Sequence, residues 1–347
     1  MAEALEKILK EKSKSEPEAF PNSSKGYYKR YASFSDYLNN EVHPFVNQAA
    51  MVLDIEKGLG FLTDHGPGHI QTVMRRAWDL LGHSSNVLSG YEVYMLLTAI
   101  HIHDAGHIRT GRKGHEKASR PLLNAQLGAD SVENAFIYSI AEAHGGEVVP
   151  GDRDKLARLV PRPFASKKFN MPFLAALLRF ADELADDYTR AARYVMGEGG
   201  IPHPSEVFHA YAFALKSVDV NLEAKEVQLS FYLSPDDATR EFGKLESKVY
   251  LLDEILDRTF KMYHECLYCM RYFPAELQIN AISVQIEFMG DSEVHQPINY
   301  RLKESGYPKL HAQHPSELCG KDLMIDGRVI DGITLKERIE KKIQEHV

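Results

Sequence analysis

The segment His101-Ile-His-Asp-Ala-Gly-His107 constrains the fold of this chain more than any other part of the sequence. It places three imidazoles and one carboxylate directly after the apolar residues 93–100, a run that predicts a buried helix. Charged groups beside a protein core are tolerated when they are paired or bind a metal ion. The alternative is a helix end with solvated histidines, because cations are favoured at helix C-termini. Ligands elsewhere in the chain decide between these two interpretations.

Further candidate ligands lie on other predicted helices, and eight of the sixteen histidines fall between residues 65 and 144. Pro and Gly mark a turn over residues 63–69, and an apolar stripe starting at Ile70 places His69 in the first turn of a helix. A helix over residues 132–143 ends at His144, and a helix over residues 172–193 contains Asp182. Imidazoles and carboxylates together suit a divalent Mn, Fe, Co, Ni or Zn ion, or Mg where oxygen ligands dominate. Facing helices of a bundle are a common frame for such an ion.

These residues also carry a resemblance to a known family. The pattern His69-x-x-x-Val73, His103-Asp104-x-Gly106 and Ala181-Asp182-Glu183-Leu184 resembles the HD superfamily of metal-dependent phosphohydrolases, over about residues 60–195. The resemblance implies a helical bundle of the HD type and a divalent metal ion, with one ion expected rather than two. The metal ligands that it implies are His69, His103, Asp104 and Asp182.

Two groups within the superfamily resemble different parts of the chain. The segment 103–107, followed by Gly114-His115-Glu116, resembles deoxynucleoside triphosphate triphosphohydrolases, although the insertion between them is longer and the usual Pro-Phe is absent. Cyclic-dinucleotide phosphodiesterases carry extra histidines for a second metal ion, and His115 and His144 could take those positions. The Gly-Tyr-Pro signature of the second group is missing here, since Gly306-Tyr307-Pro308 lies far outside the region.

The resemblance therefore implies a nucleotide phosphohydrolase, first of all one that releases triphosphate from a dNTP. A two-metal phosphodiesterase for cyclic or linear oligonucleotides is the first alternative, and a non-catalytic nucleotide sensor is the second. The C-terminal part is similar to HD proteins of bacterial conflict systems, which suggests a regulatory role or one in antiviral defence. An activating nucleotide at an allosteric site is a further expected partner.

Several residues have expected roles beside the metal ligands. Asp104 would hold both metal and water, while His115 or His107 would act as general acid or contact phosphate, since histidine titrates near neutral pH. His144 would be a general acid or a ligand of a second ion. His65 either supports His69 or belongs only to the turn, and Tyr188 either stacks on a base or, as slightly favoured, packs in the core. Because Arg matches phosphate with a planar fork, the residues expected to contact phosphate are Arg75, Arg109, Arg112 and Lys113.

The fold expected is mainly α, an HD-type helical bundle with a smaller α+β C-terminal part. We expect an N-terminal extension over residues 1–40, the HD-type domain over 41–200 and an α+β accessory region over 201–347. In the accessory region the patterns predict strands over 209–220, 227–233 and 277–288, the last with a bulge, and helices over 239–272 and 335–346. A helix is expected over residues 2–12, and the basic connection 147–170 is expected to be a lid or a solvated loop.

Composition limits the setting and the partners. A net charge of −8 argues against strong non-specific binding to nucleic acid, which depends on neutralising phosphates. No apolar run approaches the roughly 20 residues of a membrane span, and the charged N-terminus does not resemble a secretory segment. Three cysteines imply no disulfide framework, and we expect a cytoplasmic protein in which Cys266 and Cys269 pack on a helix face rather than bind zinc. The aromatic N-terminus, expected mainly in the core, and the helix over 239–272 offer apolar faces for a homo-oligomer.

Overall fold

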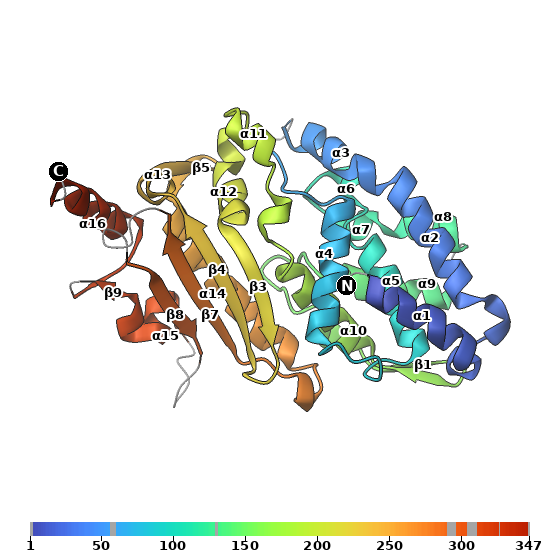
Figure 1. The fold of residues 1–347 in the computed structure, drawn as a ribbon. Coiled ribbons are helices and arrows are strands. Elements are labelled where there is room, and N and C mark those ends of the chain that lie inside the picture. Colours follow the sequence, from blue (N-terminus) through green and yellow to red (C-terminus); the bar gives the residue numbers. More distant parts are fainter. Residues whose placement is uncertain are drawn as a thin grey trace. The chain divides into compact units, whose positions relative to one another are not determined.

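The structure is a computed structural model that describes residues 3–55, 60–128, 131–289, 296–303, 311–325 and 327–345. The chain forms two compact units (Figure 1). The first comprises Met1–Lys57, Asp64–Ala185 and Arg271–Leu277, and the second comprises Gly58–Thr63, Asp186–Met270 and Gln278–Val347. The fold is mainly α with a smaller α+β part, as expected. The expected division at residues 40 and 200 remains a proposal.

The first unit is built around helix α5 (Gly90–Ile102), in which every residue except Glu92 is buried. A capping box formed by Ser89 and Glu92 starts this helix, and an apolar surface all round allows helices to pack on every side of it. The helices packed on it are α1 (Glu3–Ser15), α2 (Tyr27–Glu41), α4 (Pro67–Leu80), α9 (Val132–Glu142) and α10 (Met171–Glu183). Tyr27, Tyr31 and Phe34 of α2 are buried, which confirms the expected core packing of the aromatic cluster.

The remaining elements of the first unit are short, apart from α3 (His43–Ile55). They are α6 (His107–Thr110), α7 (His115–Ala118), α8 (Arg120–Leu127), η1 (Pro17–Ala19), η2 (Ser23–Lys25), η3 (Leu156–Arg158), η6 (Ala275–Leu277), β1 (Arg162–Phe164) and β2 (Lys167–Phe169). The prediction of a lid or solvated loop over 147–170 was wrong in part, since β1 and β2 form an antiparallel hairpin within that segment. The rings of Phe164 and Phe169 anchor this hairpin against Tyr91 and Phe136.

The helix expected over residues 172–193 was too long, because α10 ends at Glu183. Asp187 accepts hydrogen bonds from the backbone nitrogen and the hydroxyl of Thr189, and this starts a separate turn, η4 (Tyr188–Arg190). An Asp side chain that bonds the nearby backbone in this way competes with helix continuation.

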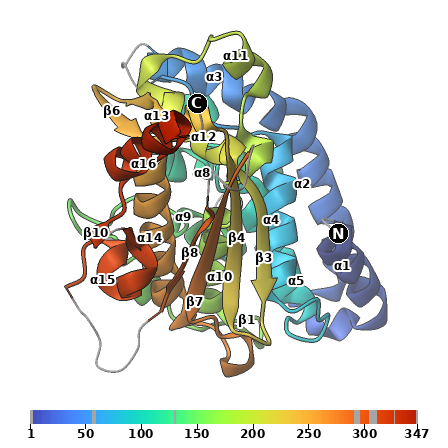
Figure 2. The ribbon, with the colours of Figure 1, turned by 60° about the vertical axis from the view of Figure 1, so that its left-hand side comes forward.

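The second unit contains a four-stranded sheet in the order β3-β4-β7-β8, which Figure 2 shows with its strands side by side. The strands are β3 (Leu215–Asn221), β4 (Glu226–Leu233), β7 (Ala281–Phe288) and β8 (Ile298–Leu302). Strands β4 and β7 are parallel, and helix α14 (Leu251–Met270) lies in the crossover that such a pair needs. The expected β-β-α-β order is confirmed, with β8 added at the edge. Cys266 and Cys269 are buried on α14, as predicted.

Three expectations for the second unit were wrong. Residues 206–214 form helix α12 (Glu206–Ala214), since Val207, Ala210, Tyr211 and Ala214 make a buried helical stripe that the alternation of alanine with larger residues conceals. The expected long helix begins only at Leu251, because residues 241–250 form the hairpin β5 (Glu241–Lys244) and β6 (Ser247–Tyr250). This hairpin requires glycine at position 243, since a Cβ there would collide with the backbone carbonyl of His203. Strand β7 starts at Ala281 and pairs with β4 in unbroken register, so there is no bulge.

The other elements of the second unit are α11 (Arg193–Gly197), η5 (His203–Ser205), α13 (Pro235–Thr239), α15 (Pro315–Cys319), η7 (Gly320–Leu323), β9 (Met324–Ile325), β10 (Arg328–Val329) and α16 (Gly332–Glu345). His346 and the segment 306–308 lie outside the described residues. Among the helices that the structure describes, none combines the length and hydropathy required to cross a membrane.

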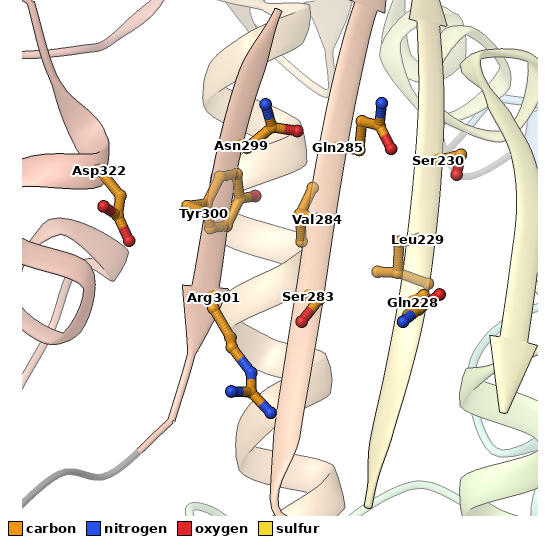
Figure 3. A pocket seen from close by; sticks show the side chains of 10 residues that line it. All are labelled: Gln228, Leu229, Ser230, Ser283, Val284, Gln285, Asn299, Tyr300, Arg301 and Asp322. Carbon is orange, nitrogen blue, oxygen red and sulfur yellow. The ribbon is translucent and has the colours of Figure 1, made fainter. Parts of the chain in front are cut away.

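The face of the sheet opposite helix α14 is polar and contains a hollow (Figure 3). A hollow of about 450 Å³ is lined there by Gln228, Leu229, Ser230, Ser283, Val284, Gln285, Asn299, Tyr300, Arg301 and Asp322. Glu226 accepts hydrogen bonds from Gln228 and Ser283 and pairs with Arg301. These polar groups satisfy one another, as is usual for a sheet with one solvated face.

Candidate metal centre

The ends of three helices bring the four expected metal ligands together in the first unit. His69 lies in the first turn of α4, His103 caps the C-terminus of α5 with Asp104 next to it, and Asp182 lies in the last turn of α10. The Nε2 atom of His69 is 3.3 Å from Oδ2 of Asp104 and 3.1 Å from Oδ1 of Asp182. The Nε2 atom of His103 is 3.3 Å from the same Oδ2. One atom from each residue lies within 4.8 Å of the others, and we call these four residues the primary set.

The donor atoms of the primary set fit a divalent cation. The Nε2 atoms of His69 and His103 are buried and have no hydrogen-bond partner among the described residues, although carboxylate oxygens lie nearby. The Nδ1 atom of His103 donates to the carbonyl of Ile100 at 2.7 Å, so in the neutral ring Nε2 carries the lone pair. Imidazole nitrogens and carboxylate oxygens converge on one space, and a divalent transition ion accepts both.

The other oxygen of Asp104 faces two more histidines. Its Oδ1 lies 3.3 Å from Nε2 of His115, at the start of α7, and 3.4 Å from Nε2 of His144, just after α9. Their Nδ1 atoms donate to the carbonyls of Arg112 at 3.0 Å and Ala141 at 2.5 Å. The two Nε2 atoms lie 3.1 Å apart, so two lone pairs face each other unless a proton or a cation lies between them. We call Asp104, His115 and His144 the second set.

Charge within this cluster shifts the ionisation of its members in opposite directions. Burial lowers the pKa of His103, but Asp104 and Asp182 outweigh burial and raise it to about 10. Burial raises the pKa of Asp104, but the charge of the nearby histidines, first of all His103, brings it well below its usual range. Asp182 shows the same balance, with His103 and His69 lowering its pKa. Burial lowers the pKa of His144, whereas Asp104 outweighs burial at His115 and raises its pKa. The metal-free cluster therefore holds protons that an ion must displace.

Buried basic residues fix His144 at the end of α9. The ammonium group of Lys155 donates to the carbonyl of Glu142 at 3.0 Å, and Nη1 of Arg179 donates to the carbonyl of Ala143 at 3.3 Å. Both side chains are buried, and cations at a helix C-terminus also interact favourably with the helix dipole. Neither role was predicted from the sequence, where Lys155 is one of several basic residues in the connection 147–170.

The loop between His103 and His115 is held by close packing and by a buried acid. A Cβ on Gly106 would collide with the backbone carbonyl of His115, so only glycine allows the two segments to approach. Asp54 is fully buried and accepts a hydrogen bond of 3.0 Å from the backbone nitrogen of Arg112. Sequence reasoning also missed Asp54, which lies about 50 residues before the loop.

The residues expected to contact phosphate are dispersed. Arg112 and Lys113 line a groove of about 440 Å³ that also exposes His115 and Lys117. Arg75 is half-buried on α4 and Arg109 is exposed on α6, and neither lines this groove. Tyr188 belongs to the second unit and is 39% exposed there, so its expected packing in the core was wrong. His101 is buried away from these sets, with Nε2 3.0 Å from the hydroxyl of Tyr31.

Comparison with models of known protein families identifies a match. The HD-CE family model matches residues 59–261, which is more than half of the chain and includes every member of the primary and second sets. No curated protein shows significant similarity to the chain.

Proposed function

Because the chain belongs to the HD-CE family, an HD-type family, we propose that it is a metal-dependent hydrolase of phosphate esters in nucleotides. The observation that carries the proposal is the carboxylate of Asp104, whose two oxygens face the primary set and the second set. A divalent ion at such a centre supplies Lewis acidity that polarises a phosphoryl group and favours attack by water.

The side chains of the centre differ in their access to solvent. The side chain of Asp182 is 23% exposed and that of His115 is 17% exposed, whereas those of His69, His103 and Asp104 are at most 5% exposed. A substrate can therefore reach the centre beside His115 and Asp182. His115 also lines the basic groove, so it is our first candidate to protonate the leaving group, before His144 and His107.

Release of triphosphate from a dNTP is the reaction that we place first. Its support is the local sequence 103–107 with His115-Glu116, together with the groove that Arg112, Lys113 and Lys117 line beside the partly exposed imidazole of His115. The side chains of Arg112, Lys113 and Lys117 would bind the phosphates that are not attacked.

A phosphodiesterase acting on cyclic or linear oligonucleotides is the second candidate. The second set favours it, since the imidazoles of His115 and His144 face Oδ1 of Asp104 and are suited to a second ion. Counted over the primary and second sets alone, one ion is the first expectation for the triphosphohydrolase, and two ions are the expectation for the phosphodiesterase.

Product analysis tests both candidates. The protein is incubated with Mn²⁺ and a panel of dNTPs, NTPs and cyclic dinucleotides, and bound metal is counted in parallel. Nucleoside with triphosphate supports the first candidate, whereas a monophosphate or a linear dinucleotide supports the second. Asp104→Asn should abolish turnover, and His83→Ala, an exposed histidine outside the centre, should retain it. If the natural protein turns over no substrate of the panel, and so behaves like Asp104→Asn, both candidate reactions are refuted. That result would favour a nucleotide sensor.

Several expectations stay predictions at this point. They are the cytoplasmic location, a homo-oligomer, an allosteric nucleotide, weak binding to nucleic acid, and a regulatory or antiviral role. The role of Tyr188 in stacking a base is a prediction of the same kind.

A further inference from the structure

A third group of candidate ligands contains Asp104 again, together with two histidines that belong to neither set described above. It consists of His65, in the turn before α4, together with Asp104 and His107 at the start of α6. One ligand atom from each lies within 4.8 Å of the others, and the rings of His65 and His107 are 4.8 Å apart between centroids. We call these three residues the third set.

The orientation of His107 leaves an acceptor atom facing an acceptor atom. Its Nδ1 lies 3.1 Å from the carbonyl of Gly111, and a carbonyl only accepts, so Nδ1 carries the hydrogen. The Nε2 atom then presents its lone pair, and it lies 3.6 Å from Oδ1 of Asp104. The side chain of His107 is 2% exposed, so water does not screen the repulsion between these two atoms. A proton on Nε2 or a cation between the two atoms removes that repulsion, and a metal ion can do so while also binding His65.

The turn that carries His65 is held in place by contacts of its own. The backbone nitrogen of His65 donates to Oδ1 of Asn47 at 2.8 Å, and Nδ2 of Asn47 donates to Asp64 at 2.6 Å. Asp64 also accepts a hydrogen bond of 2.8 Å from the backbone nitrogen of Gly66. These contacts fix the backbone at His65 without help from an ion, which is the preorganisation that a metal site needs.

We propose that His65, Asp104 and His107 bind a divalent transition ion that is distinct from the ion of the primary set and from any ion of the second set. Two imidazoles and one carboxylate form a ligand set that suits Mn, Fe or Co and leaves coordination positions open for water or an anion. Asp104 would then serve all three sets, with Oδ2 toward the primary set and Oδ1 toward the other two. This site depends on the ligands alone and not on which nucleotide is hydrolysed.

Ion counting tests the proposal on the full-length protein. The protein is saturated with Mn²⁺, freed of unbound ion by gel filtration, and analysed for manganese per chain by mass spectrometry. The double variant His65→Ala/His107→Ala should lose one ion per chain relative to the natural protein. His144→Ala removes a ligand of the second set only, so it should lose a further ion if the second set is occupied and none if it is empty, and in both cases the double variant should still lose one. The exposed control His83→Ala should lose none. A double variant that keeps the full ion count overturns the proposal.

A second variant keeps the test decisive if the double variant does not fold. His107→Cys retains a ligand atom, so in the Co²⁺-loaded protein it should produce a sulfur-to-cobalt charge-transfer band that His83→Cys lacks. Adding His65→Ala should weaken that band. A folded, cobalt-loaded His107→Cys protein without the band contradicts the proposal. Both measurements are made without substrate, so they succeed or fail independently of nucleotide hydrolysis.

Discussion

Lys155→Met should loosen the end of α9 and with it His144. Lys155 is 7% exposed at its side chain, and its ammonium group donates to the carbonyl of Glu142 at 3.0 Å. Methionine keeps most of the buried volume but leaves that carbonyl without its donor, which costs about 1–3 kcal/mol of stability. The ion pair with the Glu142 carboxylate, which is 31% exposed, adds little because solvent screens it.

The same substitution should weaken metal binding, since Lys155 fixes the helix end that carries His144. Losing a group that orients a metal ligand typically costs about 10–100-fold in affinity. We expect that loss for the ion held by the second set and little change for the ion held by the primary set. Chemical denaturation of the metal-free protein gives the stability change, and calorimetric titration with Mn²⁺ gives the two affinities.

Two comparisons make this prediction specific. Lys155→Arg keeps a donor and should recover most of the metal affinity, while Lys168→Met changes an exposed lysine of β2 and should alter stability by less than about 0.5 kcal/mol. If Lys155→Met binds Mn²⁺ as tightly as Lys168→Met does, then Lys155 does not position His144 and the reasoning is refuted.

Three further predictions follow from the centre and its loop. Asp104→Asn should remove bound ions from every set and lower turnover by more than about 100-fold, measured by metal analysis and product assay, because Asp104 is a direct ligand in each set. Affinity for Mn²⁺ should rise as pH rises toward 10, since the raised pKa of His103, about 10, means that a proton must leave before the ion binds. The expected slope is about tenfold per pH unit for each proton released, and a flat calorimetric profile would contradict it. Gly106→Ala should destabilise the protein by about 1–3 kcal/mol in denaturant unfolding, because its Cβ meets the carbonyl of His115. Gly145→Ala, where a Cβ meets no atom of the residues that the structure describes, is the matched control and should be near neutral.

The features that could be predicted from sequence are those with a local cause. The apolar run before His103 predicts buried α5, and Pro67 followed by the stripe from Ile70 predicts the start of α4. If the helices form a bundle, the metal ligands at their ends are therefore predicted to lie near one another. Helix boundaries failed where a side chain changed the local balance, as Asp187 does after α10.

The features that could not be predicted depend on residues far apart in the chain. Nothing in the sequence shows which oxygen of Asp104 faces His115, or that Asp54 holds the backbone of Arg112. In the second unit, the sequence pattern places Gly243 within a helix, where glycine is only unfavourable. Its real role, allowing the backbone of His203 to approach, depends on the folded structure. The alanine-rich segment 209–214 satisfies both a strand and a helix pattern, and only packing against the sheet decides between them.

The single carboxylate of Asp104 makes the ion-binding steps thermodynamically dependent on one another. An ion at the primary set would draw electron density through Oδ2, and a second dication within a few ångströms would meet direct repulsion. Successive ions should therefore bind with falling affinity, in a negatively cooperative series whose coupling free energy is the same in either order. A centre of this kind changes its state in steps as the free metal concentration rises, so the metal supply of the cell would set how many ions are bound.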